Sequence, residues 1–144
     1  MTARIGPIHH VAIVVRSIEA ALPRYRSFFG LEPDGEPRLF EPQGVRLCFL
    51  PTGSGDAARL ELIEPIDADS GVGRYLATRG EGLHHVCFVT GDLPATLDAL
   101  AAAEAELIDE RPRSGAHGTV AFLHPRSLSG VLWELLERPR AASG

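Results

Sequence analysis

The sequence predicts an α+β fold made of two tandem βαβββ modules, whose strands form a curved mixed sheet around a cleft. Two observations support this prediction. The same order of strand-like and helix-like segments occurs twice in the 144 residues. The matching segments also share residues, because "IHHVAIVV" (8–15) corresponds to "LHHVCFV" (83–89) and "LELIEP" (60–65) corresponds to "WELLERP" (133–139). A four-stranded sheet with one helix buries only one of its faces, so two such modules can share a core.

The first module is predicted over residues 1–66. It opens with the strand-like segment 8–15 and continues with a helix over 17–30, for which Ser17 provides the N-cap and Gly30 the C-terminal stop. The apolar residues of this helix fall on one stripe that is predicted to face the sheet: Leu22, Tyr25, Phe28 and Phe29. Three strand-like segments follow, separated by Pro and Gly: 36–40, 45–51 and 59–65.

The rest of the chain divides into a linker, the second module and a disordered tail: 67–82, 83–139 and 140–144. A short helix is predicted around 71–79 in the linker. The helix of the second module spans 92–105 and begins after the cap residue Asp92. The strands predicted for the second module are 83–89, 106–112, 119–125 and 130–139.

The composition narrows the class of protein. Apolar residues make up 44% of the chain and charged residues 23%, which is typical of a soluble globular protein. The net charge of −5 argues against a nucleic-acid partner. No apolar run reaches the length of about 18 residues that a membrane span needs, and the first residues lack the apolar core of a signal peptide. These features favour a cytoplasmic protein, in which Cys48 and Cys87 are buried thiols.

Each module begins with a pair of histidines in a strand. Because successive side chains of a strand alternate between its faces, His9 and His10 are predicted to point to opposite faces, and so are His84 and His85. Alternation alone leaves open which histidine of each pair faces inward. A single histidine in a strand is more often a hydrogen-bonded structural residue than a metal ligand.

Each module also has a glutamate inside its last apolar strand, Glu61 in the first and Glu134 in the second. A glutamate in a strand more often lies on a solvent-exposed face, and a buried carboxylate is costly without a partner. An approximate twofold relation between the modules would bring two histidines and two glutamates together around a divalent metal ion. Such a set leaves coordination positions open for a substrate. The recurrence of both residue types in both modules favours this metal site.

Three stretches together resemble the vicinal oxygen chelate superfamily, which includes glyoxalases, extradiol dioxygenases, antibiotic-resistance proteins and methylmalonyl-CoA epimerases. They are "HHVAIVVRSIEAALPRY" (9–25), "ELIEPIDADSGVGRYLATRGEGLHH" (61–85) and "LIDERPRSGAHGTVAFLHPRSLSGVLWEL" (107–135), and they are most similar to the epimerases. The resemblance implies the glyoxalase-like fold, a homodimer, and a divalent metal ion, which is Co²⁺, Mn²⁺, Ni²⁺ or Zn²⁺. It also implies four metal ligands, the second histidine of each pair and the two strand glutamates: His10, His85, Glu61 and Glu134.

The resemblance implies epimerisation of methylmalonyl-CoA by 1,1-proton transfer through a metal-stabilised enolate, with Glu134 as a catalytic acid/base. Some epimerases carry a second glutamate at the position of Leu47, which cannot move a proton. Either another group such as His117 or a metal-bound water does so, or the protein catalyses a different reaction.

An acyl-CoA substrate would also need protein groups that contact it. His117 and Arg126 are the candidate substrate-binding residues, although a turn histidine or a loop arginine is often only solvated. Two alternative functions stay open: a glyoxalase-type lyase or isomerase that acts on a thiol adduct, and a non-catalytic protein that binds small molecules. The predicted ligand set disfavours the binding protein, whereas Leu47 favours a reaction other than epimerisation.

Overall fold

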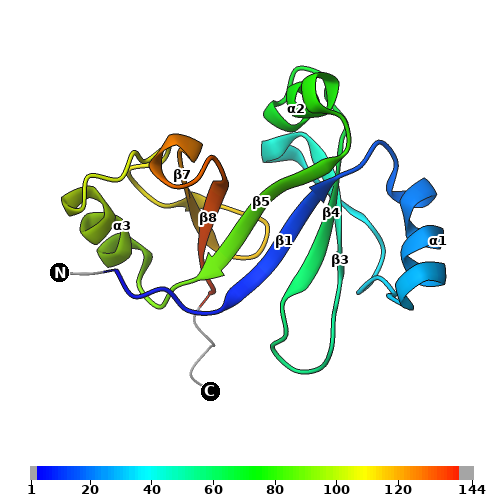
Figure 1. Ribbon diagram of the computed structural model, residues 1–144, viewed down its shortest axis with the longest axis horizontal. Coiled ribbons are helices and arrows are strands. Elements are labelled where there is room, and N and C mark those ends of the chain that lie inside the picture. Colours follow the sequence, from blue (N-terminus) through cyan, green and yellow to red (C-terminus); the bar gives the residue numbers. More distant parts are fainter. Residues whose placement is uncertain (1–2, 140–144) are drawn as a thin grey trace. The chain divides into compact units, whose positions relative to one another are not determined.

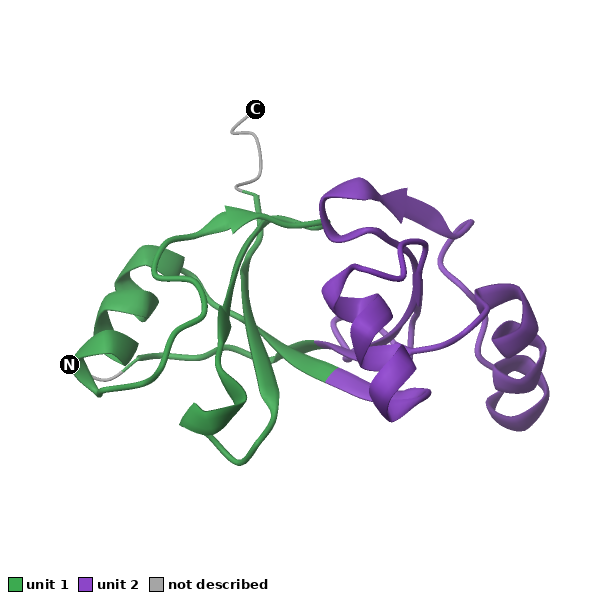
Figure 2. Ribbon diagram, turned by 90° about the horizontal axis from the view of Figure 1, so that it is seen from above, with its two compact units in different colours: residues 1–9, 85–144 green, residues 10–84 purple. Residues whose placement is uncertain are grey.

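The computed structural model describes residues 3–139, and these form two compact units. Unit 1 contains the chain up to His9 and again from His85, and unit 2 contains residues 10–84 (Figure 2). Strands β1 (Ile8–Val14) and β5 (Gly82–Val89) therefore contribute residues to both units. Each unit contains four strands of the βαβββ pattern that the repeat predicts.

Unit 2 contains the following further elements in chain order: α1 (Ile18–Phe29), β2 (Arg38–Phe40), a 3-10 turn (Glu41–Gln43), β3 (Val45–Leu50), β4 (Arg59–Pro65) and α2 (Gly71–Arg79). Its sheet has the order β2-β3-β4-β1, in which β1 and β4 are parallel and the other neighbours are antiparallel. Helix α1 packs against this sheet, and α2 contacts β4 (Figure 1). The helix predicted in the linker is confirmed as α2.

Helix α1 begins and ends where the sequence predicts. The Ser17 hydroxyl accepts a hydrogen bond from the Ala20 amide at 3.1 Å and so caps the first turn. Gly30 adopts a left-handed conformation with φ 67°, which allows its amide to donate to the Arg26 carbonyl and stop the helix.

The apolar stripe predicted for α1 is only partly correct. Leu22 is buried and Tyr25 packs against the same core cluster, but Phe28 and Phe29 are each 71% exposed. The cluster contacts the helix from Ile18 to Tyr25, so the last turn extends past the apolar surface that the sheet offers. Helical periodicity does not show how far the apolar surface of the sheet extends beneath the helix.

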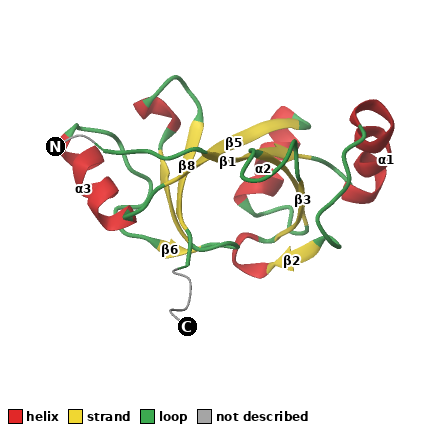
Figure 3. Ribbon diagram, turned by 90° about the horizontal axis from the view of Figure 1, so that it is seen from below, coloured by secondary structure: helices red, strands yellow, loops and turns green. Residues whose placement is uncertain are grey.

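Unit 1 contains the following elements after β5: α3 (Leu93–Ala102), β6 (Arg113–Ser114), β7 (Thr119–Leu123), a 3-10 turn (Pro125–Ser127) and β8 (Leu132–Glu137). Its sheet has the order β5-β8-β7-β6, again with one parallel pair, β5 and β8, and antiparallel neighbours otherwise. Helix α3 packs on β7 and β8. Figure 3 shows α3 in red and β6 and β8 in yellow. The two units thus repeat one topology.

The predicted strand at 106–112 is wrong. This segment makes only an isolated bridge between Leu107 and Leu123, and the short strand β6 comes after it. The Asp109 carboxylate accepts the hydrogen bond of the Phe122 amide at 2.9 Å, where a paired strand would offer a carbonyl. A side chain therefore replaces part of the backbone ladder. Helix α3 is also shorter than the predicted 92–105, because it ends at Ala102.

A second glutamate of the last strand fixes the helix in each unit. Glu64 accepts a hydrogen bond from the Ile18 amide at 2.8 Å, and Glu137 accepts one from the Leu93 amide at 2.7 Å. Both amides belong to the first helical residue, where a backbone N–H has no partner within the helix. The same interaction ties α1 to β4 and α3 to β8, so the repeat extends to side-chain contacts.

Each sheet has two distinct faces because its side chains alternate. The face under the helix is apolar and contains Cys48, Leu50 and Leu62 in unit 2. We call the other face the open face; in unit 2 it carries Phe49 and Glu61, which are direct cross-strand partners. The candidate functional residues lie on the open faces.

The C-terminal tail and membrane-spanning helices were the subject of two further predictions. The predicted tail at 140–144 lies outside the described residues. Among residues 3–139, no helix has the length and apolar character that crossing a membrane requires.

Candidate functional site

Unit 2 holds a buried histidine–glutamate pair on its open face. Glu61 lies directly opposite Ala12 in the β1–β4 pairing, and His10 precedes Ala12 by two residues on the same face. The structure brings His10 Nε2 and Glu61 Oε1 to 3.5 Å. The two residues are only 3% and 5% exposed, so both donor atoms are held away from bulk solvent.

Unit 1 holds the matching pair. Glu134 lies directly opposite Cys87 in the β5–β8 pairing, and His85 precedes Cys87 by two residues. His85 Nε2 and Glu134 Oε1 are 3.2 Å apart, and both residues are buried. Each unit therefore supplies, by itself, one imidazole nitrogen and one carboxylate oxygen on its open face.

A phenylalanine packs against the histidine in each pair. The Phe49 ring lies 5.4 Å from the His10 ring, and the Phe122 ring lies 5.7 Å from the His85 ring, edge to face. These two residues are not among the site residues that the sequence predicts. The signal was present, because Phe49 and Phe122 occupy the same place in "RLCFL" and "TVAFL".

An arginine also packs on each phenylalanine ring. The Arg59 guanidinium lies 5.8 Å from the Phe49 ring centre, and that of Arg113 lies 5.2 Å from the Phe122 ring centre. At these distances the guanidinium is attracted to the face of the ring. Each histidine thus packs against a ring that also contacts an arginine.

The donor atoms of each pair suit a bound divalent ion. Two atoms bound to one ion at about 2.1 Å would lie about 3 Å from each other, close to the 3.2 and 3.5 Å observed. Imidazole nitrogen and carboxylate oxygen are ligands of Zn²⁺, Co²⁺, Mn²⁺ and Ni²⁺. Burial also makes a carboxylate that lacks a cation costly. The residues present therefore fit a metal ion.

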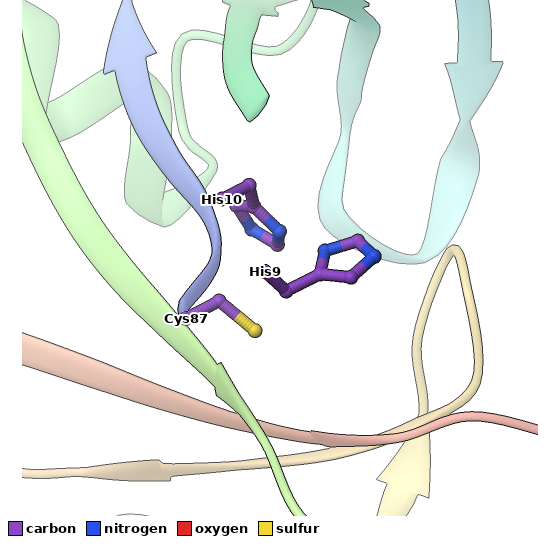
Figure 4. Close-up of side chains that lie close together, drawn as sticks. All are labelled: His9, His10 and Cys87. Atoms are coloured by element: carbon purple, nitrogen blue, oxygen red, sulfur yellow. The ribbon is translucent and has the colours of Figure 1, made fainter. Parts of the chain in front are cut away.

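His9 does not point to the face opposite His10, so the prediction from strand alternation is wrong at this position. A nitrogen of His9 and the Cys87 sulfur lie within 4.8 Å of each other, and Cys87 shares the open face with Glu134 (Figure 4). The His9 ring also lies 6.2 Å from that of His117. Strand β1 changes its partner next to His9, because its pairing with β4 begins only at His10. Alternation fails at this change of partner.

Three other predicted residues have defined surroundings. His84 packs its ring edge to face on Tyr75 of α2 at 4.9 Å. Leu47 is 3% exposed and lies opposite Ile63, so it sits on the open face of unit 2 and adds no proton-transfer group there. His117 lies half-buried in the β6–β7 turn of unit 1.

Arg126 is held on the surface of unit 1 by a two-point contact with Glu106. Its Nη2 and Nε donate to the two carboxylate oxygens at 2.6 and 3.2 Å. These hydrogen bonds hold the pKa of Glu106 below its usual value. A substrate anion would have to compete with Glu106 for this guanidinium.

Comparison with known proteins places the chain in a family. The model of the Glyoxalase/Bleomycin resistance protein/Dioxygenase superfamily matches residues 9–122. The chain is 41% identical over 131 residues to the uncharacterized protein YqjC of Bacillus subtilis, covering 90% of this chain and 91% of that protein. It is 36% identical over 134 residues to the ethylmalonyl-CoA/methylmalonyl-CoA epimerase of Cereibacter sphaeroides, covering 91% and 97%.

The fold of the chain is also similar to that of a solved epimerase structure. A variant of the Streptomyces coelicolor methylmalonyl-CoA epimerase in complex with 2-nitronate-propionyl-CoA is 35% identical, with a TM-score of 0.85 over 95% of this chain and 100% of that one. The predicted fold and the predicted resemblance to the epimerases are both confirmed. The chain belongs to the Glyoxalase/Bleomycin resistance protein/Dioxygenase superfamily, which is the vicinal oxygen chelate superfamily that its repeated histidines and glutamates indicate.

Proposed function

We propose that this protein is a metal-dependent epimerase of malonyl-type acyl-CoA thioesters, with methylmalonyl-CoA as the substrate. The relatives named as epimerases of methylmalonyl-CoA match nearly the whole chain, which supports this substrate class. The observation that carries the proposal is the buried histidine–glutamate pair in each unit, at 3.5 Å in unit 2 and 3.2 Å in unit 1.

The proposed metal ligands are one pair from each unit: His10, Glu61, His85 and Glu134. A single divalent ion bound by all four would be Co²⁺, Mn²⁺, Ni²⁺ or Zn²⁺. Glu61 adds a second carboxylate to Glu134, and two anionic oxygens favour a divalent cation over a monovalent one. The ion would supply Lewis-acid stabilisation of the negative charge that develops on the thioester oxygen.

The chain's own residues would move the protons. Removing the α-proton from one face and delivering one to the other face requires two acid/base groups on opposite sides of the α-carbon. We assign one of these roles to Glu134, which is buried on the open face beside His85. Leu47 cannot serve as the second group, and we assign that role to the half-buried His117.

The test is deuterium exchange at the α-carbon. The metal-loaded protein is incubated with methylmalonyl-CoA in deuterated water, and the α-deuterium is measured by mass spectrometry. We expect exchange in the wild type and none with Glu134→Gln, because the amide cannot accept the proton. Glu137→Gln is the matched control, since Glu137 lies on the same strand but binds the Leu93 amide, and it should keep exchanging. Absence of exchange with all four metal ions would refute the epimerase function.

Leu47 favours one alternative function. An open face with an apolar side chain at this position suits an isomerase or lyase of glyoxalase type that acts on a thiol adduct. Turnover of a hemithioacetal by the metal-loaded protein, without α-proton exchange on methylmalonyl-CoA, would establish this alternative. The homodimer and the cytoplasmic location stay predictions, and sedimentation of the purified protein tests the first of them.

A further inference from the structure

We propose that Arg38 of unit 2 binds the free carboxylate of the acyl-CoA substrate and so makes the site selective for malonyl-type thioesters over neutral ones. This inference rests on the proposed function and deepens it, because it assigns a protein group to the carboxylate of the substrate. The feature that carries it is the position of Arg38 on the edge strand β2, directly opposite Leu47.

Strand pairing places Arg38 on the open face of unit 2. Arg38 lies opposite Leu47 in the β2–β3 pairing, and Leu47 lies opposite Ile63 in the β3–β4 pairing. Directly opposite residues of an antiparallel pair point to the same face. The next row on this face holds Phe49 and Glu61. Strands about 4.8 Å apart and alternate residues about 6.8 Å apart put the Cα atoms of Arg38 and Glu61 about 12 Å from each other, a gap that two long side chains and a small anion can bridge.

Unit 1 shows how far an arginine at this position reaches. Arg113 lies opposite Val120 in the β6–β7 pairing, and Val120 precedes Phe122 by two residues, as Leu47 precedes the phenylalanine of unit 2. The Arg113 guanidinium lies 5.2 Å from the Phe122 ring centre. A side chain from the edge strand therefore extends over the row that contains Phe122 and Glu134.

Arg113 itself is the poorer candidate for a substrate carboxylate. Its Nε lies 3.2 Å from an Asp109 carboxylate oxygen, and Asp109 also accepts the hydrogen bond of the Phe122 amide. A substrate anion would have to compete with this aspartate for the guanidinium. We therefore confine the inference to Arg38.

The charges on the open face of unit 2 suit an anionic group. Besides His10, the ionisable side chains that the strand register places on this face of β1 to β4 are Arg38, Arg59 and Glu61. Leu47 carries no charge, whereas the glutamate that some epimerases have at this position would face Arg38 and compete with a substrate carboxylate. A planar guanidinium can donate two parallel hydrogen bonds to one carboxylate.

A paired carboxylate would also ease the proposed proton transfer. The α-carbon of a malonyl thioester lies between the thioester and the carboxylate, so removal of its proton adds a second negative charge close to the first. A guanidinium bound to the carboxylate reduces the repulsion between these two charges. Arg38 would therefore favour both binding of the substrate and formation of the enolate.

A pair of CoA thioesters tests this inference. Malonyl-CoA and acetyl-CoA differ only in the carboxylate, so the ratio of their dissociation constants isolates its contribution. Calorimetric titration of the metal-loaded, full-length protein measures both constants. We expect Arg38→Gln to lower the preference for malonyl-CoA by about tenfold or more and to leave the Kd of acetyl-CoA within about twofold. Arg38→Lys should retain part of the preference, because it keeps the charge but loses the paired hydrogen bonds.

Arg24→Gln is the matched control. Arg24 is exposed on α1, which packs on the opposite face of the same sheet, and its replacement removes the same charge. This variant should keep the preference of the wild type. A similar loss of preference in Arg24→Gln and Arg38→Gln would show a general effect of net charge and would overturn the inference.

Three further results would overturn it: no preference for malonyl-CoA in the wild type, an unchanged preference in Arg38→Gln, or an equal loss of affinity for both thioesters, which would assign Arg38 to the CoA phosphates. Should Arg38→Gln fail to fold, Arg38→Lys decides the question, and a preference equal to that of the wild type refutes the site.

The binding ratio needs no proton transfer, so it separates this inference from the proposed function. A preference that falls in Arg38→Gln, in a protein that shows no α-proton exchange, would support the carboxylate site and refute the epimerase. Exchange in the wild type, with a preference that Arg38→Gln leaves unchanged, would refute the role of Arg38 alone.

Discussion

At the scale of single residues, three side chains recur in each unit: a histidine on the first strand, a phenylalanine on the third and a glutamate on the fourth. The repeat in the sequence predicted the histidine and the glutamate because charged or polar residues inside apolar strands need a reason to be there. The phenylalanine was not predicted, because an aromatic residue in a strand is unremarkable until its contact with the histidine is known.

The contact between the Phe122 and His85 rings leads to a prediction for metal binding. Phe122→Leu removes the edge-to-face contact that orients the His85 ring, so Co²⁺ affinity should fall by about tenfold while the number of bound ions stays the same. Phe88→Leu is the matched control, because Phe88 stacks on Trp133 under α3 and should leave affinity unchanged. Calorimetric titration with Co²⁺ measures both. Equal affinity in Phe122→Leu and the wild type would show that the ring does not position the histidine.

The raised pKa of Cys48 leads us to expect a loss of stability at alkaline pH. Burial, with a smaller contribution from Glu61, raises the pKa of its thiol from 9.0 to about 11. Because the folded pKa is the higher one, the stabilisation is complete below pH 9.0 and is lost as the pH rises through about 11. Over this range the free energy of unfolding should drop by up to about 3 kcal/mol from this group. Urea denaturation of the wild type and Cys48→Ala at both ends of the range measures it. The same drop in both proteins would assign the effect to other groups.

At the scale of elements, the helix starts were predictable because they depend on local chemistry. Ser17 and Asp92 each accept a hydrogen bond from the amide three residues later, as their residue types favour. Residues 106–112 do not form the predicted strand. The Asp109 carboxylate in this segment accepts a hydrogen bond from the Phe122 amide, which lies on another strand. No pattern within the segment shows such a distant contact.

The glutamates that hold the helices predict a symmetric effect on stability. Glu64→Ala and Glu137→Ala each leave the first amide of a helix without its acceptor, which should cost about 1 kcal/mol in the free energy of unfolding. Glu64→Ala also removes the 3.1 Å contact with Arg46, so its loss should be at least as large as that of Glu137→Ala. Glu110→Ala is the control, because Glu110 is exposed in unit 1 and should change stability by less than about 0.5 kcal/mol. Chemical denaturation measures all three. A loss confined to one of the two capping residues would contradict their equivalence.

At the scale of the whole molecule, the duplication explains how much the sequence could predict. The order of elements and the matching His–Glu residues follow from two copies of one pattern. The surroundings of His9 do not follow from it. Strand β1 is shared between both units, and its change of pairing partner breaks the alternation that a single copy would obey.

The central proposal is that one histidine–glutamate pair from each unit binds the same metal ion. The most direct test is the stoichiometry of Co²⁺, measured by elemental analysis after dialysis, in the wild type, His10→Ala and His85→Ala. We predict one ion per chain in the wild type and loss of that ion in both variants, because each removes a ligand from a shared site. Two ions per chain, with each variant losing only one of them, would contradict the claim.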